Sequence, residues 1–173
     1  AGLLLKSFQR LESVDLGFNA ENTLTMVASL PRTKYDNEEK ALHFYDSTLD
    51  QLRNAPGIRS VGLTTNLPFT DGGEVDGFIV EGQEPPEGVN ISQSEQAELQ
   101  SVTPGTFQAL GVPLLQGRDF QNTDGAKARR VAIIDENMAP TYWPNADAVG
   151  KRLKLGSGTN NNPWLTVVGV VAN

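Results

Sequence analysis

The chain has 173 residues, of which 38% are hydrophobic and 20% charged, a composition typical of a folded protein that buries a core. Its 21 acidic and 14 basic residues give a net charge of -7, which argues against nucleic-acid binding because phosphates require a concentrated positive surface. The lack of cysteine excludes disulfides and thiol catalysis, and the single histidine, His43, argues against a transition-metal site. No metal or other cofactor is therefore expected.

Residues 1–8 contain three consecutive leucines followed by a lysine. Eight residues are too few to span a bilayer, which takes about 20 apolar residues. They can instead end such a span, with the basic residues that follow marking the exit into water. The alternative is an amphipathic first helix in which Leu4, Phe8 and Leu11 pack on one side. The residues of this segment leave both interpretations open.

The next stretch predicts a β-α-β unit. Residues 24–30 alternate apolar and polar side chains, which predicts a half-buried strand. Asp36 is expected to cap the following helix, with Glu39 completing a capping-box pair. Residues 58–66 are rich in β-branched side chains and predict a second strand. The two strands should be parallel neighbours joined by a right-handed crossover.

The second half of the chain predicts several short strands separated by two short helices. The strands are expected at 76–81, 97–102, 131–134, 150–155 and 165–171, the last two paired across the turn at 156–162. Thr103 and Pro104 are expected to open one helix, which ends at Gly111. Asp135 is expected to cap the other, which runs through Tyr142. Between them, residues 113–120 should be extended and bent at Gly117.

No combination of residues predicts a catalytic centre. His43 lies outside the apolar stripe of its predicted helix and is interpreted as a surface residue, with no G-x-S-x-G motif beside it. The acids Glu81, Glu84 and Glu87 fall in a Pro/Gly-rich loop that fixes no carboxylate pair. The chain is therefore expected not to be an enzyme. A hydrolase using the acids of residues 71–87 is kept as an alternative.

Other candidate sites have a structural interpretation beside the functional one. Residues 122–125 resemble a fragment of a calcium loop but lack its trailing glutamate, so a turn is expected. The aromatic stretch Trp143-Pro144, together with Trp164, could line a binding face, although core packing or loop anchoring is favoured. Two short basic clusters are interpreted as solvated surface, namely Lys127, Arg129 and Arg130, and Lys151, Arg152 and Lys154.

Taken in order, several short motifs resemble the segment that follows the first transmembrane helix of FtsX/MacB-type permeases, in particular the duplicated orphan permease branch. Each motif is short, but their order and spacing along the chain are specific. They are the stretches at 1–11, 14–19 and 22–25, PGI at 56–58 with VG at 61–62, VTPGTF at 102–107, LGVPL at 110–114, GRDF at 117–120, VAIIDE at 131–136, YWP at 142–144, VGKRL at 149–153 and VVGVV at 167–171.

This resemblance implies an α+β fold, that of a MacB-like periplasmic core domain. A porter-like β-α-β part would occupy residues 18–70, and an inserted small α/β subdomain, called Sabre-like, would occupy residues 71–173. Residues 1–17 would be the end of transmembrane helix 1 and a stalk, and the parent chain would continue past residue 173. The implied coupling stalk consists of Leu3, Leu4, Leu5, Phe8 and Leu11.

The resemblance also implies a function. The chain would be a non-catalytic extracytoplasmic domain of an ABC-transporter-type permease, at the periplasmic face of the bacterial inner membrane, acting in mechanotransmission, export or partner contact. Implied partners are a cytoplasmic ATPase subunit, a second permease copy that forms a dimer, and a periplasmic or outer-membrane protein, with no nucleic acid. The alternative is a freestanding periplasmic module that binds a ligand or peptide through the loop at 82–96.

Overall fold

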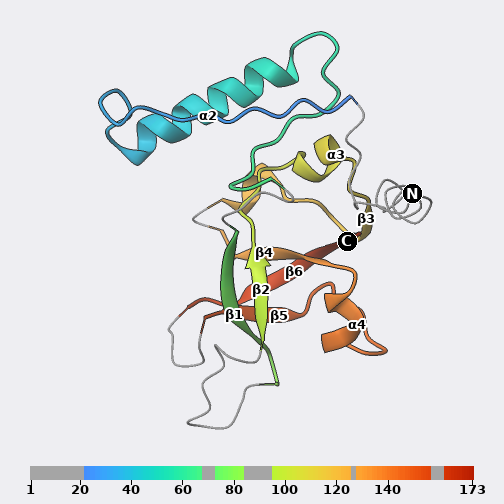
Figure 1. Ribbon diagram of the computed structural model, residues 1–173. Coiled ribbons are helices and arrows are strands. Elements are labelled where there is room, and N and C mark those ends of the chain that lie inside the picture. The colour runs from blue at the N-terminus through green and yellow to red at the C-terminus, as the bar shows by residue number, and fades with distance from the viewer. Residues whose placement is uncertain (1–21, 68–72, 84–94, 126–127, 157–161) are drawn as a thin grey trace, which may run out of the picture.

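The computed structural model describes residues 22–67, 73–83, 95–125, 128–156 and 162–173. Helix α2 (Glu38–Arg53) lies at one end of the molecule and a six-stranded sheet at the other, with the short helix α3 (Thr106–Leu110) between them (Figure 1). The combination of separate helices with a largely antiparallel sheet confirms the predicted α+β class.

The sheet is organised around its last strand. Its members are β1 (Glu74–Val80), β2 (Gln96–Leu99), β3 (Leu114–Gly117), β4 (Val131–Asp135), β5 (Arg152–Leu155) and β6 (Leu165–Val171). The order is β2-β1-β5-β6-β3, and β4 also pairs with β6. β6 is antiparallel to β5 and β3 and parallel to β4. The predicted antiparallel pairing of the last two strands is thus confirmed.

The hydrophobic core lies on one face of this sheet. Its buried members are Phe78, Val80, Ile134, Trp143, Ala148, Leu153, Val167 and Val170. Helix α4 (Met138–Tyr142) covers the face, and its residues Met138, Ala139 and Tyr142 pack against the cluster. Because each fully buried side chain of this size contributes about 1.5–3 kcal/mol, the core is the main source of stability for this part of the chain.

The predicted β-α-β unit is only partly formed, because neither of its strands is present. Residues 24–30 are extended but pair with no strand in the described ranges. Residues 58–66 form a single bridge, Thr64 with Val102, and that bridge is antiparallel. A strand needs a neighbour to receive its hydrogen bonds, and side-chain alternation alone does not supply one. The segment 60–65 instead exchanges hydrogen bonds with the turn before α3.

Two of the predicted helix caps are shifted. The cap of α2 is Asn37, whose Oδ1 accepts a hydrogen bond of 2.9 Å from the Lys40 amide. Asp36 lies one residue too early and instead pairs with the Lys40 ammonium at 2.8 Å. Asn and Asp are about equally good caps, so the composition of this stretch does not choose between them.

Helix α3 also begins later than predicted, at Thr106, with Gly105 rather than Thr103 before its first residue. Its predicted end is confirmed, because Gly111 has a left-handed backbone with φ 71°. Asp135 lies before α4 as expected, and its Oδ1 accepts hydrogen bonds from the amides of Asn137 and Met138. The predicted bend at Gly117 is confirmed as well, with φ 72°.

Candidate functional site

The predicted coupling stalk, Leu3, Leu4, Leu5, Phe8 and Leu11, lies outside the described residues, and so does the centre of the loop at 82–96. Of the acids proposed for a hydrolase, Asp71, Glu84 and Glu87 also lie outside them. Asp76 accepts a hydrogen bond from the Gly77 amide, and Glu81 pairs with Arg152. Asp76 and Glu81 are therefore held by different partners and do not form a carboxylate pair.

Several hydrogen bonds join the segment after α2 to the turn that leads into α3. We call this contact the joint, and it consists of residues 60–65, 101–107 and 118–120. Two backbone bonds cross it, from the Thr65 amide to the Ser101 carbonyl at 3.0 Å and from the Thr103 amide to the Leu63 carbonyl at 2.9 Å. The joint connects the part of the chain that carries α2 with the part that carries the sheet (Figure 1).

Hydroxyl groups complete the joint. Thr103 Oγ1 accepts a hydrogen bond of 2.7 Å from the Leu63 amide, and Ser60 Oγ donates one of 2.9 Å to the Gly105 carbonyl. Thr106 is 4% exposed, and its hydroxyl lies within 3.1 Å of the Leu63 carbonyl and 2.8 Å of the Thr103 carbonyl. A buried hydroxyl is stable only when it is bonded, so these contacts fix the geometry of the turn.

The GRDF motif, residues 117–120, contacts the turn before α3 from the other side of the joint. Asp119 Oδ2 accepts a hydrogen bond of 3.1 Å from the Gly105 amide. The rings of Phe107 and Phe120 stack, with centroids 6.4 Å apart and an interplanar angle of 25°. Arg118 forms a forked pair with Asp124, and the two N–O distances are 2.7 Å and 2.9 Å. The Arg118 guanidinium lowers the pKa of the Asp124 carboxyl. Residues Asn122–Asp124 form a single 3-10 turn, which confirms the turn predicted at 122–125, and the Arg118–Asp124 pair connects this turn to the joint.

Sequence reasoning missed the joint because its bonds connect residues about 40 positions apart. The VTPGTF and GRDF motifs were recognised as family features, but the helical cap proposed for Thr103 was the wrong role. The available signal was the concentration of Thr, Ser and Gly in residues 60–65 and 101–107, residue types that allow close backbone approach and bond to backbone groups.

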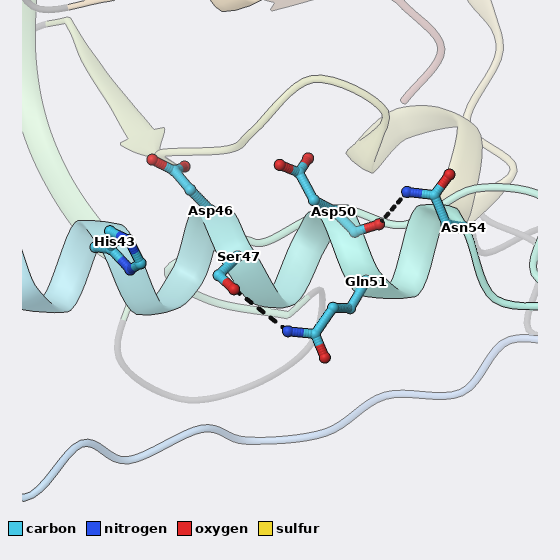
Figure 2. Close-up of a pocket in the computed structure, with 6 residues that line it drawn as sticks. All are labelled: His43, Asp46, Ser47, Asp50, Gln51 and Asn54. Atoms are coloured by element: carbon cyan, nitrogen blue, oxygen red, sulfur yellow. Dashed lines mark hydrogen bonds between the residues drawn. The ribbon is translucent and has the colours of Figure 1, made fainter.

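An open groove of about 630 Å³ runs along one side of α2 (Figure 2). It is lined by His43, Asp46, Ser47, Asp50, Gln51 and Asn54. His43 is exposed, as predicted, and no hydrogen bond joins it to a carboxylate in the described ranges. Gln51 instead donates to Ser47 Oγ at 3.3 Å, and Asn54 donates to the Asp50 carbonyl at 2.7 Å. This arrangement is a solvated polar helix face.

A second groove, of about 610 Å³, lies between β3 and α4 and has an apolar floor. Buried Trp143, Ala148 and Val170 line it from the core side, and Leu115 lines it from β3. Trp143 therefore belongs to the core, as favoured, whereas Pro144 is exposed. Trp164 lies elsewhere, beside Arg152 and Lys154, so the three residues do not form one binding face.

Tyr142 anchors α4 to the hairpin of β1 and β2. Its hydroxyl donates a short hydrogen bond to Glu95 Oε2, and its carbonyl accepts one of 2.9 Å from Gln83 Nε2. Its ring packs edge-on against Phe78, with centroids 5.1 Å apart. Burial, assisted by the bond to Glu95, raises the pKa of Tyr142 to about 12. The hydroxyl therefore stays protonated and serves as a structural donor.

An extended apolar stretch precedes α2. Leu24, Met26 and Val27 are 95%, 78% and 88% exposed, which is unusual for three large apolar side chains within four residues. Within the described ranges, no three His, Asp or Glu side chains lie close enough to hold a metal ion. No described helix is long and apolar enough to cross a bilayer.

The fold and the joint define a two-part α+β domain. The family model for the MacB-like periplasmic core domain matches residues 11–173, so the chain belongs to that family. Curated proteins give no match.

Two solved structures resemble the chain. The periplasmic region of MacB from Actinobacillus actinomycetemcomitans is 20% identical, with a TM-score of 0.48, over 74% of this chain and 50% of that one. The extracellular domain of the noncanonic ABC-type transporter YknZ from Gram-positive bacteria is 16% identical, with a TM-score of 0.38, over 74% of this chain and 57% of that one. The chain thus spans about half the length of each structure.

Proposed function

We propose that this chain is a non-catalytic extracytoplasmic domain of an ABC-transporter-type permease and that it acts by mechanotransmission. Movement entering through the part that carries α2 would pass through the joint to the sheet. The observation that supports this proposal is the joint itself, where buried Thr106 and the hydroxyls of Ser60 and Thr103 bind the two parts together. A bonded, close-packed contact transmits displacement, whereas a loose linker absorbs it.

The proposed entry point is the coupling stalk formed by Leu3, Leu4, Leu5, Phe8 and Leu11, at the end of transmembrane helix 1. Residues 18–70 would be the porter-like part and residues 71–173 the Sabre-like part. The exposed side chains of Leu24, Met26 and Val27 support a further proposal, that another segment of the parent protein covers this stretch. A Met26→Cys reporter should react with maleimide at least about tenfold more slowly in the parent permease than in the isolated chain, and equal rates would rule out the cover.

The proposed location is the periplasmic face of the inner membrane, and the proposed process is export. Partners would be a cytoplasmic ATPase subunit, a second permease copy in a dimer, and a periplasmic or outer-membrane protein. The family supports this proposal, as do the structures it resembles, one a periplasmic region of MacB and the other a domain of an ABC-type transporter.

The proposal is tested in the parent permease, reconstituted with its ATPase in proteoliposomes. The variant Thr106→Val keeps the side-chain volume but removes the hydroxyl that holds the joint. Its matched control is Thr141→Val, because the exposed Thr141 on α4 donates a hydroxyl hydrogen bond of 2.7 Å to the Asn137 carbonyl. We expect Thr106→Val to uncouple ATP hydrolysis from export while the control behaves as wild type. Equal coupling in all three proteins, at equal expression, would contradict the proposal.

A second candidate function is a freestanding module that binds a ligand or peptide. The groove between β3 and α4 favours it, because Trp143 and Val170 provide an apolar floor beneath the polar rim residues Gln116 and Asp147. Thermal-shift screening of the chain against apolar peptides tests this function. A hit whose stabilisation is lost in Leu115→Glu would support it, and the lack of any hit would reject it.

A further inference from the structure

Strand β5 presents two cations on the face of the sheet opposite the core. Side chains alternate along a strand, and Leu153 and Leu155 belong to or pack against the core cluster, so Arg152 and Lys154 project to the other side. Trp164 contacts both cations, with its ring centroid 5.7 Å from the Arg152 guanidinium and 5.3 Å from the Lys154 ammonium. We call Arg152, Lys154 and Trp164 the Trp164 face.

The Trp164 face combines two cationic side chains with a buried aliphatic side chain from the neighbouring strand. Ile79 pairs in register with Lys154 and is 3% exposed, so an aliphatic side chain lies under the cations. The Trp164 ring is half-buried and offers its π surface to both cations. Arg152 and Lys154 are thereby held in place by the ring, so a ligand would meet them with less loss of side-chain entropy than free surface cations would cost.

Further positive charge converges on the same end of the sheet. Thr166 pairs in register with Arg152, and its amide donates to the Arg130 carbonyl at 3.0 Å, which brings Arg129 and Arg130 to the neighbouring strand. Lys151 comes directly before β5. Among the described residues, Glu81 is the one carboxylate that forms an ion pair with any of these cations. Such a concentration is unexpected in a chain whose net charge is -7.

The way in which Glu81 is bound indicates that the Trp164 face binds carboxylates. Arg152 Nε donates to Glu81 Oε2 at 2.7 Å, and Arg152 Nη2 donates to Glu81 Oε1, which is a forked guanidinium–carboxylate contact beside the indole ring. Arg152 also lowers the pKa of the Glu81 carboxyl. Lys154 offers an equivalent position two residues along the strand that no described carboxylate occupies.

The spacing of the two cations favours an extended peptide as the ligand. Residues i and i+2 of a strand are about 6.6 Å apart, so carboxylates on alternate residues of an extended segment match Lys154 and Arg152, and at Arg152 the segment would take the place of Glu81. An anionic bilayer would impose no such spacing. We propose that the Trp164 face binds an extended acidic segment of a partner protein, with carboxylates at alternate positions. This binding is separate from mechanotransmission and needs no ATPase.

The test uses fluorescence anisotropy of a labelled octapeptide that alternates Glu and Thr, with an octapeptide that alternates Lys and Thr as the charge control. We expect the acidic peptide to bind wild type, and the affinity to fall as salt rises. Lys154→Glu should weaken binding about tenfold or more. Lys40→Glu is the matched control, because it makes the same charge change on exposed α2 and should leave the affinity within about twofold of wild type.

Four results would overturn the proposal. The first is that the acidic peptide binds no better than the basic one. The second is an equal loss of affinity in Lys154→Glu and Lys40→Glu, which would be an effect of net charge. The third is binding to phosphatidylglycerol vesicles without peptide binding, which would assign the face to a membrane. A glutamate peptide with its charges in one block should bind more weakly, and equal affinity would refute the spacing argument. All of these results leave the mechanotransmission proposal standing.

Discussion

At the scale of single residues, the joint depends on how closely its backbones approach. Gly62 lies directly against Thr106, and a Cβ added at Gly62 would come within 2.5 Å of Thr106 Cα and 2.7 Å of Thr106 N. These are backbone atoms, so no side-chain rotation relieves the contact. The position therefore requires a glycine because of space rather than because of its own backbone angles.

We expect Gly62→Ala to destabilise the chain by about 2 kcal/mol or more, because the clash must separate the two segments of the joint. Gly125→Ala is the matched control, since the nearest atom to its added Cβ is the Asn122 carbonyl oxygen at 3.9 Å. Urea denaturation of both variants measures the difference. Similar midpoints for Gly62→Ala and Gly125→Ala would mean that the joint is not closely packed.

Tyr142 makes a prediction about pH. Burial and Glu95 raise its pKa to about 12, whereas an unfolded tyrosine titrates near about 10. Between these values the unfolded chain loses a proton that the folded chain keeps, so stability is full below pH 10 and falls as the pH rises toward 12. The difference in tyrosinate absorbance between wild type and Tyr142→Phe isolates this titration. We expect a midpoint of about 12, and a midpoint of about 10 would show that Tyr142 is neither buried nor bonded to Glu95.

At the scale of elements, substitutions at Asn37 and Asp36 test which of these residues caps helix α2. Asn37→Ala removes the acceptor of the Lys40 amide and should cost about 1 kcal/mol of stability. Asp36→Ala removes only the exposed pair with the Lys40 side chain and should cost less than about 0.5 kcal/mol. Circular dichroism during thermal unfolding compares the two. A larger loss in Asp36→Ala would reverse the assignment.

Elements whose pattern is local were predicted well from the sequence. Helix α2, the end of α3 at Gly111 and the strands β5 and β6 follow from apolar spacing, a left-handed glycine and β-branched runs. The segments 24–30 and 58–66 failed because a strand is defined by its partner, and alternation at 24–30 says nothing about which chain lies beside it. Residues 60–65 instead contact residues 101–106 through hydrogen bonds of hydroxyl groups, and the apolar periodicity of the sequence does not predict such bonds.

The candidate site was predicted less completely than the fold. The family motifs VTPGTF and GRDF were recognised, but their physical role was not, because Asp119 meets Gly105 and Thr106 meets Leu63 only after the chain has folded. The alternation of Arg152 and Lys154 was visible in the sequence. Their contact with Trp164 was not, because it depends on the pairing of β5 with β6.

At the scale of the whole molecule, the proposed mechanotransmission requires two parts of the chain to move together. One part carries α2 and the exposed stretch around Leu24, and the other carries the sheet, its core and the Trp164 face (Figure 1). The chain has no native cysteine, so introduced cysteines can carry spin labels at chosen positions without interference from the domain. Gln51 on α2 and Ala146 beyond α4 are both exposed and lie in different parts.

The most direct test of this account is the distance between spin labels at Gln51→Cys and Ala146→Cys, measured by double electron–electron resonance in the parent permease with and without ATP. A rigid joint predicts a narrow distance distribution with the same mean in both states, and Thr106→Val should broaden it. A mean that changes with ATP in the wild type, or a Thr106→Val distribution as narrow as wild type, would contradict transmission through the joint.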